Sequence, residues 1–181
     1  RLTQDFDGFA KGNYAGSTGA GRLMSAGDFL DWRLRGAFSA VRQWGANFAE
    51  MKDGSSNVVA LGEIVAVESG GDDRGAWGWC TGPLFSGRAN CGGARIFTPN
   101  TKQFMDCSPY ASNNQTAQVF NQRNNPDSAG ADGGVGARGY HPGGVMFALG
   151  DGSVHLFSET IDQTLYLNLL AVGDGNPVSV P

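Results

Sequence analysis

Two apolar runs near the end of the chain predict a β-hairpin. Val145–Leu149 and Ser153–Phe157 flank the tripeptide Gly150-Asp151-Gly152. An Asp-Gly pair between two such runs is a strong hairpin signal, because a type I′ turn needs positive φ at both central residues. Both faces of the hairpin are largely apolar. We therefore expect it to lie in the centre of a sheet that is covered on both sides.

The turn also predicts a register. With Asp151-Gly152 as a two-residue loop, Leu149 lies opposite Val154 and Phe147 lies opposite Leu156. Each side chain is thereby assigned to one face of the sheet.

Weaker patterns predict the remaining elements. Residues 57–67 are rich in β-branched side chains and predict a strand, with 76–80 as the returning strand and 95–97 as a third, short one. Residues 37–51 favour a strand followed by a turn, and 27–35 a short helix with Asp28 as its N-cap. Residues 160–172 predict a helix, whose apolar face consists of Ile161, Leu165, Leu169 and Val172. Thr160 and Gln163 would form its capping box, and Gly173 would be its C-cap.

Composition favours a loop-rich β protein over a helical bundle. Gly accounts for 29 of 181 residues, and only 17% of residues are charged. We expect one domain over 1–181 with a loop-rich insertion at about 98–139, a stretch dense in Asn, Pro, Ser and Gly. The net charge of −4 gives no reason to expect nucleic acid or an anionic membrane as a partner. No apolar run is long enough to span a bilayer.

The three cysteines do not form a metal or redox motif. Cys80, Cys91 and Cys107 contain no C-x-x-C pair. An extracellular or envelope setting would favour one disulfide with one Cys left over. A bond between Cys80 and Cys91 closes the shortest loop, although the sequence does not fix the pairing.

One motif carries a family resemblance. His141, nine residues and then Asp151-Gly152 resemble the C-terminal signature of a large family of secreted type IV pilin-like proteins of unknown function, abundant in planctomycetes. Three further segments agree with that family in order: Asn13-Tyr14-Ala15-Gly16, Asp53-Gly54-Ser55-Ser56-Asn57 followed by Gly62-Glu63, and Arg74-Gly75-Ala76-Trp77.

The resemblance implies a pilin-like head of the α+β class. An antiparallel sheet built on 57–80 and 144–158 would pack against short helices, with a long irregular loop over one face. Relatives begin with a prepilin leader and a hydrophobic stalk helix, and this chain opens at Arg1 inside the head. The resemblance therefore implies an envelope or extracellular location, protein partners, and membrane contact only through the missing helix.

The candidate site residues each have a structural interpretation as well. His141 is a candidate metal ligand or general base, but no second His or Cys lies at ligand spacing, so we expect it to bond backbone at the hairpin entry. Asp151, with Glu159 and Asp162, gives a calcium hypothesis by analogy with related secretion pilins, yet the chain lacks a D-x-D-x-D-G loop. No cofactor is firmly predicted, and calcium is the one candidate.

Other polar and aromatic groups also have structural interpretations. We expect Asp72-Asp73 beside Arg74 to form a solvated hairpin tip with a local ion pair. Gly134–Gly139 fits G-x-G-x-x-G but follows a loop, so the dinucleotide interpretation fails its context. The four tryptophans would serve either as core and interface anchors or as a glycan-binding face: Trp32, Trp44, Trp77 and Trp79.

These observations favour a non-enzymatic structural subunit of a filament or multi-protein assembly. The alternative is an extracellular binding module for a glycan or another ligand. We do not expect an enzyme, because no nucleophile elbow or comparable catalytic motif is present.

Overall fold

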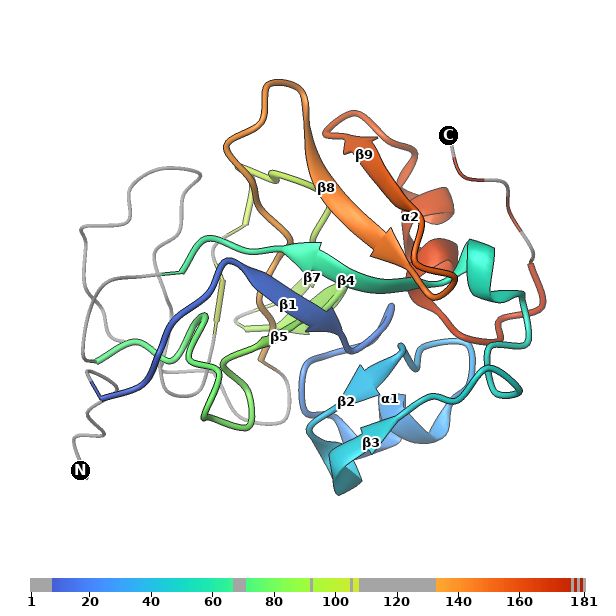
Figure 1. Ribbon diagram of the computed structural model, residues 1–181, viewed down its shortest axis with the longest axis horizontal. Helices are drawn as coiled ribbons and strands as arrows, with labels where there is room; N and C mark the ends of the chain where they lie inside the picture. The colour runs from blue at the N-terminus through green and yellow to red at the C-terminus, as the bar shows by residue number, and fades with distance from the viewer. Residues whose placement is uncertain are drawn as a thin grey trace.

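The computed structural model describes residues 8–66, 71–91, 93–104, 106–107, 133–176, 178 and 180. Figure 1 shows the arrangement of the elements in this part of the chain. In chain order they are β1 (Tyr14–Ser17), α1 (Ala26–Leu30), β2 (Phe38–Ser39), η1 (Val41–Gln43), β3 (Trp44–Gly45), η2 (Ser55–Asn57), β4 (Val59–Glu63), β5 (Leu84–Phe85), β6 (Arg88–Asn90), β7 (Ala94–Ile96), β8 (Gly144–Leu149), β9 (Val154–Ser158) and α2 (Gln163–Leu170).

The main layer is a five-stranded sheet in the order β5-β1-β4-β8-β9. Its neighbours are antiparallel except for β1 and β5, which run parallel. Two small sheets, β2-β3 and β6-β7, lie beside it. The expected α+β class is therefore confirmed. Within the described residues, no helix has the length and apolar character needed to cross a membrane.

The predicted hairpin is present, but its register differs by one residue. Ala148 pairs with Val154 and Met146 with Leu156. The Leu149 N–H donates to the Ser153 carbonyl, and the Gly152 N–H donates back to the Leu149 carbonyl. The loop therefore has three residues, and only Gly152 has a positive φ, of 86°. This is the turn-plus-bulge connection, in which the extra residue shifts every pair.

One face of the hairpin is buried beneath α2. The Phe147 ring lies 4.7 Å from that of Phe157 and 5.9 Å from that of Tyr166 on the helix. The opposite face is open: Val154 is 60% and Leu156 49% exposed. The expectation of a central hairpin covered on both sides is therefore wrong, because β9 is an edge strand and α2 covers only one side.

Several local predictions also need correction. Residues 76–80 are not a returning strand; Ala76 makes a single bridge to Lys11, while β4 pairs with β1 and β8. Helix α1 is capped by Ser25 rather than Asp28. Helix α2 has Asp162 as its N-cap and Ala171 as its C-cap, rather than Thr160 and Gly173. In each helix the residue directly before the first helical position accepts a free N–H of the first turn: Ser25 accepts from Asp28, and Asp162 accepts from Leu165.

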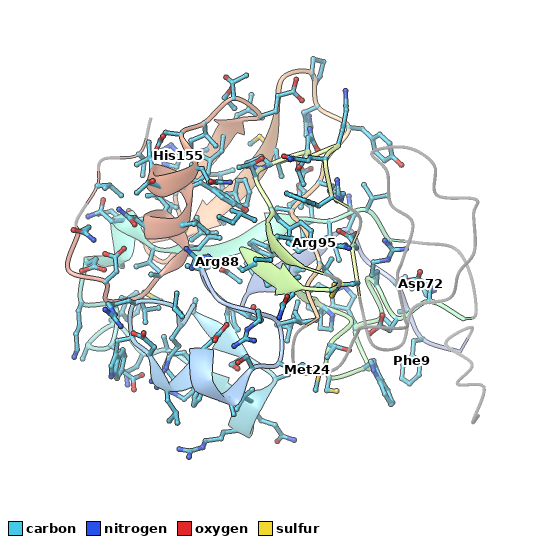
Figure 2. All side chains as sticks on the ribbon, turned by 180° about the vertical axis from the view of Figure 1, so that it is seen from behind. Phe9, Met24, Asp72, Arg88, Arg95 and His155 are labelled. Atoms are coloured by element: carbon cyan, nitrogen blue, oxygen red, sulfur yellow. A yellow bond between two sulfur atoms is a disulfide. The ribbon has the colours of Figure 1, made fainter. Side chains whose placement is uncertain are left out.

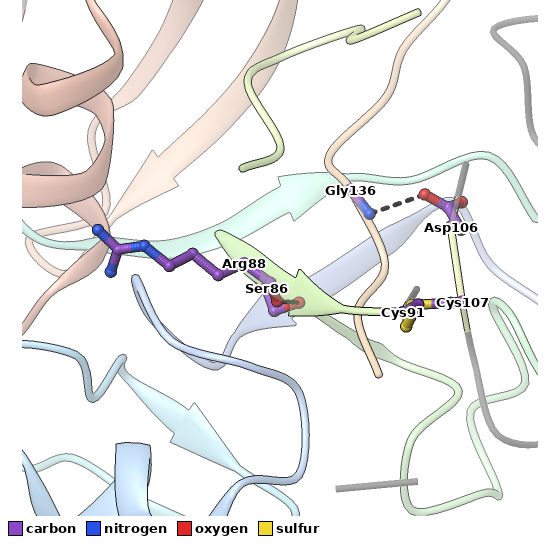
Figure 3. The surroundings of a disulfide bond; sticks show 6 residues. All are labelled: Ser86, Arg88, Cys91, Asp106, Cys107 and Gly136. Atoms are coloured by element: carbon purple, nitrogen blue, oxygen red, sulfur yellow. Dashed lines mark hydrogen bonds between the residues drawn. A yellow bond between two sulfur atoms is a disulfide. The ribbon is translucent and has the colours of Figure 1, made fainter. Parts of the chain in front are cut away.

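The disulfide joins Cys91 to Cys107, and Cys80 is a free, exposed thiol. The candidate pairing of Cys80 with Cys91, which closes the shortest loop, is therefore wrong. Cys91 follows β6, and Cys107 is held beside it by a two-bond bridge to Gly134. Tertiary pairing, and not the length of the loop, brings the two sulfurs together (Figure 3).

The predicted insertion at 98–139 is described only at its two ends. Residues 133–139 are buried, and Val135 and Ala137 belong to the main core. Asn100 also joins this segment, because its side chain accepts from the Gly139 N–H at 2.9 Å. These ends are built into the domain rather than lying over its surface. Residues 108–132 lie outside the described part of the chain.

Candidate functional site

The uncovered side of the main sheet carries exposed apolar side chains, and we call it the open face. Its exposed members come from three strands that are far apart in sequence: Tyr14 on β1, Leu61 on β4, and Val154 and Leu156 on β9, with exposed fractions of 44%, 37%, 60% and 49%. Pairing places Leu61 beside Ala148, which in turn lies beside Val154. Figure 1 views the sheet with α2 behind β8 and β9.

Register explains why these side chains share one surface. Alternate residues of a strand point to opposite faces. Val145 and Phe147 point to the core, so Met146 and Ala148 point to the open face, together with their partners on β9. At the β1 end Phe38 covers the position of Gly16, where a Cβ would lie 2.9 Å from its ring.

At the β4 end of the open face, Glu63 forms a hydrogen-bonded cluster with the signature histidine. The His141 Nε2 atom lies 3.0 Å from Glu63 Oε1. The carboxylate also accepts from the Met146 N–H at 2.9 Å, and the Tyr14 hydroxyl lies 3.4 Å from it. Burial and the Glu63 charge raise the pKa of Tyr14. His141 therefore bonds a side chain on β4, and the expectation that it bonds backbone is wrong.

The Glu63 carboxylate fills the gap where β8 begins. Glu63 is almost fully buried. Its own carbonyl accepts from the Arg138 N–H, and a Cβ on Gly139 would lie 2.4 Å from Oε2. Position 139 must therefore be glycine for the carboxylate to reach the Met146 amide. The family resemblance includes Gly62-Glu63 and His141 as separate motifs, and this contact joins them.

A cavity of about 550 Å³ opens beside this cluster. Its lining comes from the end of β4 and from the approach to β8: Asn13, Glu63, Ile64, Val65, Ala66, Arg138, Gly139, Tyr140 and His141. Tyr140 is 69% exposed at its mouth. Among the described lining residues Glu63 is the one carboxylate, and it shares the lining with the side chains of Asn13, Tyr140 and His141.

A second polar cluster lies inside the molecule. Arg74 bridges Asp72 at 2.7 Å and Asp106 at 2.9 Å, and Asp106 also binds Arg138 at 3.1 Å. All four side chains are buried. The expected solvated tip at Asp72-Asp73 is therefore wrong. In Figure 2 Asp72 lies on the same side of the molecule as Phe9, opposite the end that carries His155.

Asp106 organises this buried cluster. Burial alone would raise the pKa of Asp106, but the charges of Arg138 and Arg74 and the Gly136 N–H lower it overall. Figure 3 shows the Gly136 N–H donating to Asp106 next to the disulfide. Two arginines and two aspartates balance in charge, which is the condition for burying them. We assign the cluster a structural role.

The calcium candidates do not gather into a site. Asp151 accepts from the backbone N–H and the hydroxyl of Ser153, and Asp162 caps α2. Glu159 follows β9, where its N–H bonds Gly143. Across the described ranges there is no group of three or more His, Cys, Asp or Glu side chains that could hold a metal ion.

The tryptophans form two groups with different partners. Trp32 and Trp44 pack on the Arg35 guanidinium, whose central carbon lies 4.2 Å and 5.0 Å from their rings. Trp77 is 56% exposed, and Trp79 packs edge-on against Phe9. The first group therefore forms a cation–π cluster of half-buried rings around Arg35. The four do not make a common binding face.

The fold places this chain in the α+β class. A comparison with family models then identifies its family: residues 3–164 match the model described as "Protein of unknown function (DUF1559)", and the chain belongs to that family. Neither the curated proteins nor the solved structures give a match.

Proposed function

We propose that this protein is a non-enzymatic, pilin-like structural subunit of an extracellular or envelope assembly. The observation that carries the proposal is the open face, where apolar side chains of β1, β4 and β9 lie uncovered on one side of the sheet. Contiguous exposed apolar surface is costly in water and is typical of interaction sites. The family resemblance at His141 and Asp151-Gly152 supports a pilin-like subunit.

The disulfide supports the proposed location. Cys91 and Cys107 are both fully buried in the bonded state. Disulfides persist in extracellular and periplasmic settings and are rare in the cytosol. The bond therefore favours an oxidising compartment for the subunit.

Footprinting tests the proposal. Hydroxyl-radical labelling is compared between the isolated chain and the chain within its native complex. We expect Tyr14, Leu61 and Leu156 to lose labelling in the complex, whereas Leu30 and Phe48, which are 59% and 74% exposed elsewhere, keep it. Equal labelling of the open face in both states would refute its burial in an assembly.

A second candidate function is favoured by the cavity beside Glu63. Its polar groups and the exposed Tyr140 ring at its mouth suit a hydroxyl-rich ligand such as a glycan. A glycan array read with the parent chain and with Tyr140→Ala tests this. Signal that the substitution abolishes would favour the binding module, and an array without signal would remove it.

A further inference from the structure

Strand β9 presents free backbone groups along one edge of the main sheet. The bonds from Leu149 to Ser153 and from Glu159 to Gly143 mark the two ends of the β8–β9 ladder. Because hydrogen-bonded pairs alternate along an antiparallel ladder, the odd-numbered residues of β9 bond β8. The N–H and C=O groups of Val154 and Leu156 therefore point outward. In the part of the chain that the structure describes, β8 is the one strand that pairs with β9.

The two edges of the sheet differ in how they are protected. Edge strand β5 has two residues, and both are buried. Edge strand β9 has five residues, of which three are exposed. Its sequence, Val154–Ser158, contains no Pro and no Lys, and its pairing with β8 runs without a bulge. Shortness, Pro, Lys and bulges are the devices that usually prevent an edge strand from joining another one, and β9 lacks them.

We propose that β9 pairs with β9 of a second copy of this chain, antiparallel, about a two-fold axis at Leu156. This contact rests on the proposed structural function and names one partner and one surface for it. The N–H and C=O groups that point away from β8 can bond the second copy only if the even-numbered residues of the two β9 strands lie opposite each other. The register that uses them best places Leu156 opposite Leu156 of the second copy, and Val154 opposite Ser158. The Ser158 carbonyl also accepts from the Ile161 N–H of its own chain at 3.1 Å, so at that position it would use its second lone pair.

The side chains complement each other in this register. The two Leu156 side chains meet on the open face and shield each other's exposed half. On the other face, His155 lies diagonal to Glu159 of the second copy, within reach of a long side chain. The two-fold axis repeats this histidine–carboxylate contact, so each copy supplies one partner to each pair.

The size of the contact sets its strength. A single five-residue edge buries less surface than a standard stable interface, for which each partner contributes about 800 Å². Pairing through β9 is therefore weak in dilute solution and becomes populated where copies are concentrated. This suits a subunit that other contacts hold in an array.

Amide hydrogen exchange tests the pairing directly. Exchange at Leu156 and Phe157 is measured on the whole chain from micromolar to millimolar concentration, with self-association followed by sedimentation. The Phe157 amide bonds β8 in either state and serves as an internal reference. We expect Leu156 exchange to slow by at least about tenfold as copies associate, while Phe157 changes little.

A pair of Leu→Lys variants completes the test. Leu156→Lys places two like charges opposite each other at the axis and weakens self-association by about tenfold. Leu30→Lys changes a leucine on α1 that is 59% exposed, against 49% for Leu156, and leaves self-association unchanged. If the chain self-associates while the Leu156 amide exchanges as fast as in the single copy, edge pairing is overturned and the proposed structural function still stands. A chain that stays monomeric up to millimolar concentration would also overturn the pairing, and the native complex then decides the function separately.

Discussion

The His141 Nε2 atom lies 3.0 Å from Glu63 Oε1, although 78 residues separate the two along the chain. This contact ties the segment that enters β8 to the end of β4. His141 therefore holds the segment before β8 against the end of β4, beside the open face.

Removing either partner should destabilise the fold unequally. His141→Ala removes one hydrogen bond from a half-exposed ring and should cost about 1 kcal/mol. Glu63→Ala leaves the buried Met146 N–H without its acceptor and should cost about 1–3 kcal/mol. Denaturant unfolding measures both. His155→Ala, which loses a bond to the Ser153 hydroxyl, is the control and should cost less. Equal losses of unfolding free energy in all three variants would contradict this role of the His141–Glu63 contact.

Substituting Asp106 should be far more damaging than substituting an ion-paired aspartate at the surface. Asp106→Asn leaves two buried arginines short of an anion, for an expected loss of about 3–5 kcal/mol. Asp31→Asn, which breaks the surface pair with Arg33, is the matched control and should cost much less. Similar unfolding midpoints for the two variants would show that the buried cluster contributes little.

The Asp106 carboxylate also predicts that the protein loses stability in acid. The folded protein holds the pKa of Asp106 below its value in the unfolded chain, which is about 4. The stabilisation that the ionised Asp106 carboxylate gives the fold is therefore complete at pH values above about 4. It is lost as the pH falls through the lowered native pKa. Unfolding free energies measured from neutral pH downward should therefore decline in acid, and the Asp106→Asn curve should be flatter.

Asp174 predicts the opposite trend. Burial first, and then the charge of Asp53, raise the pKa of Asp174. A raised carboxyl pKa stabilises the fold at low pH, and this stabilisation is lost as the pH rises through the native value. Asp174→Asn should therefore melt at a higher temperature than the parent at neutral pH, with the difference shrinking in acid. A variant that melts lower at neutral pH would contradict this repulsion.

The thiols provide a chemical test of the disulfide. One thiol, that of Cys80, should react with a thiol reagent in the native protein. Replacing Cys91 and Cys107 together by Ser opens a 16-residue loop and should cost about 3 kcal/mol, whereas Cys80→Ser should be neutral. Three reactive thiols in the native chain would contradict the bond.

Local signals predicted the elements better than their partners. The Asp151-Gly152 pair located the hairpin, but Gly150 joined the loop and shifted the register by one residue. Periodicity located α2, and β-branched content located β4. These features depend on neighbours in sequence, which is why a single chain reveals them.

The site could be predicted only in fragments. The resemblance pointed to His141 and to Gly62-Glu63 separately, but the contact between His141 and Glu63 is fixed by strand pairing. Asp106 and Arg138 meet across a separation of 32 residues, as do Asp106 and Arg74, which composition cannot anticipate. The open face itself follows from the order of the strands, since β9 could be recognised as an edge only after β8 was paired with β4.

Native mass spectrometry of the gently purified complex tests the structural role most directly. We expect the chain to be recovered as a homopolymer or within a multi-protein assembly of defined stoichiometry. Recovery of a single free copy, with the 19.0 kDa mass of these 181 residues, would contradict the structural role.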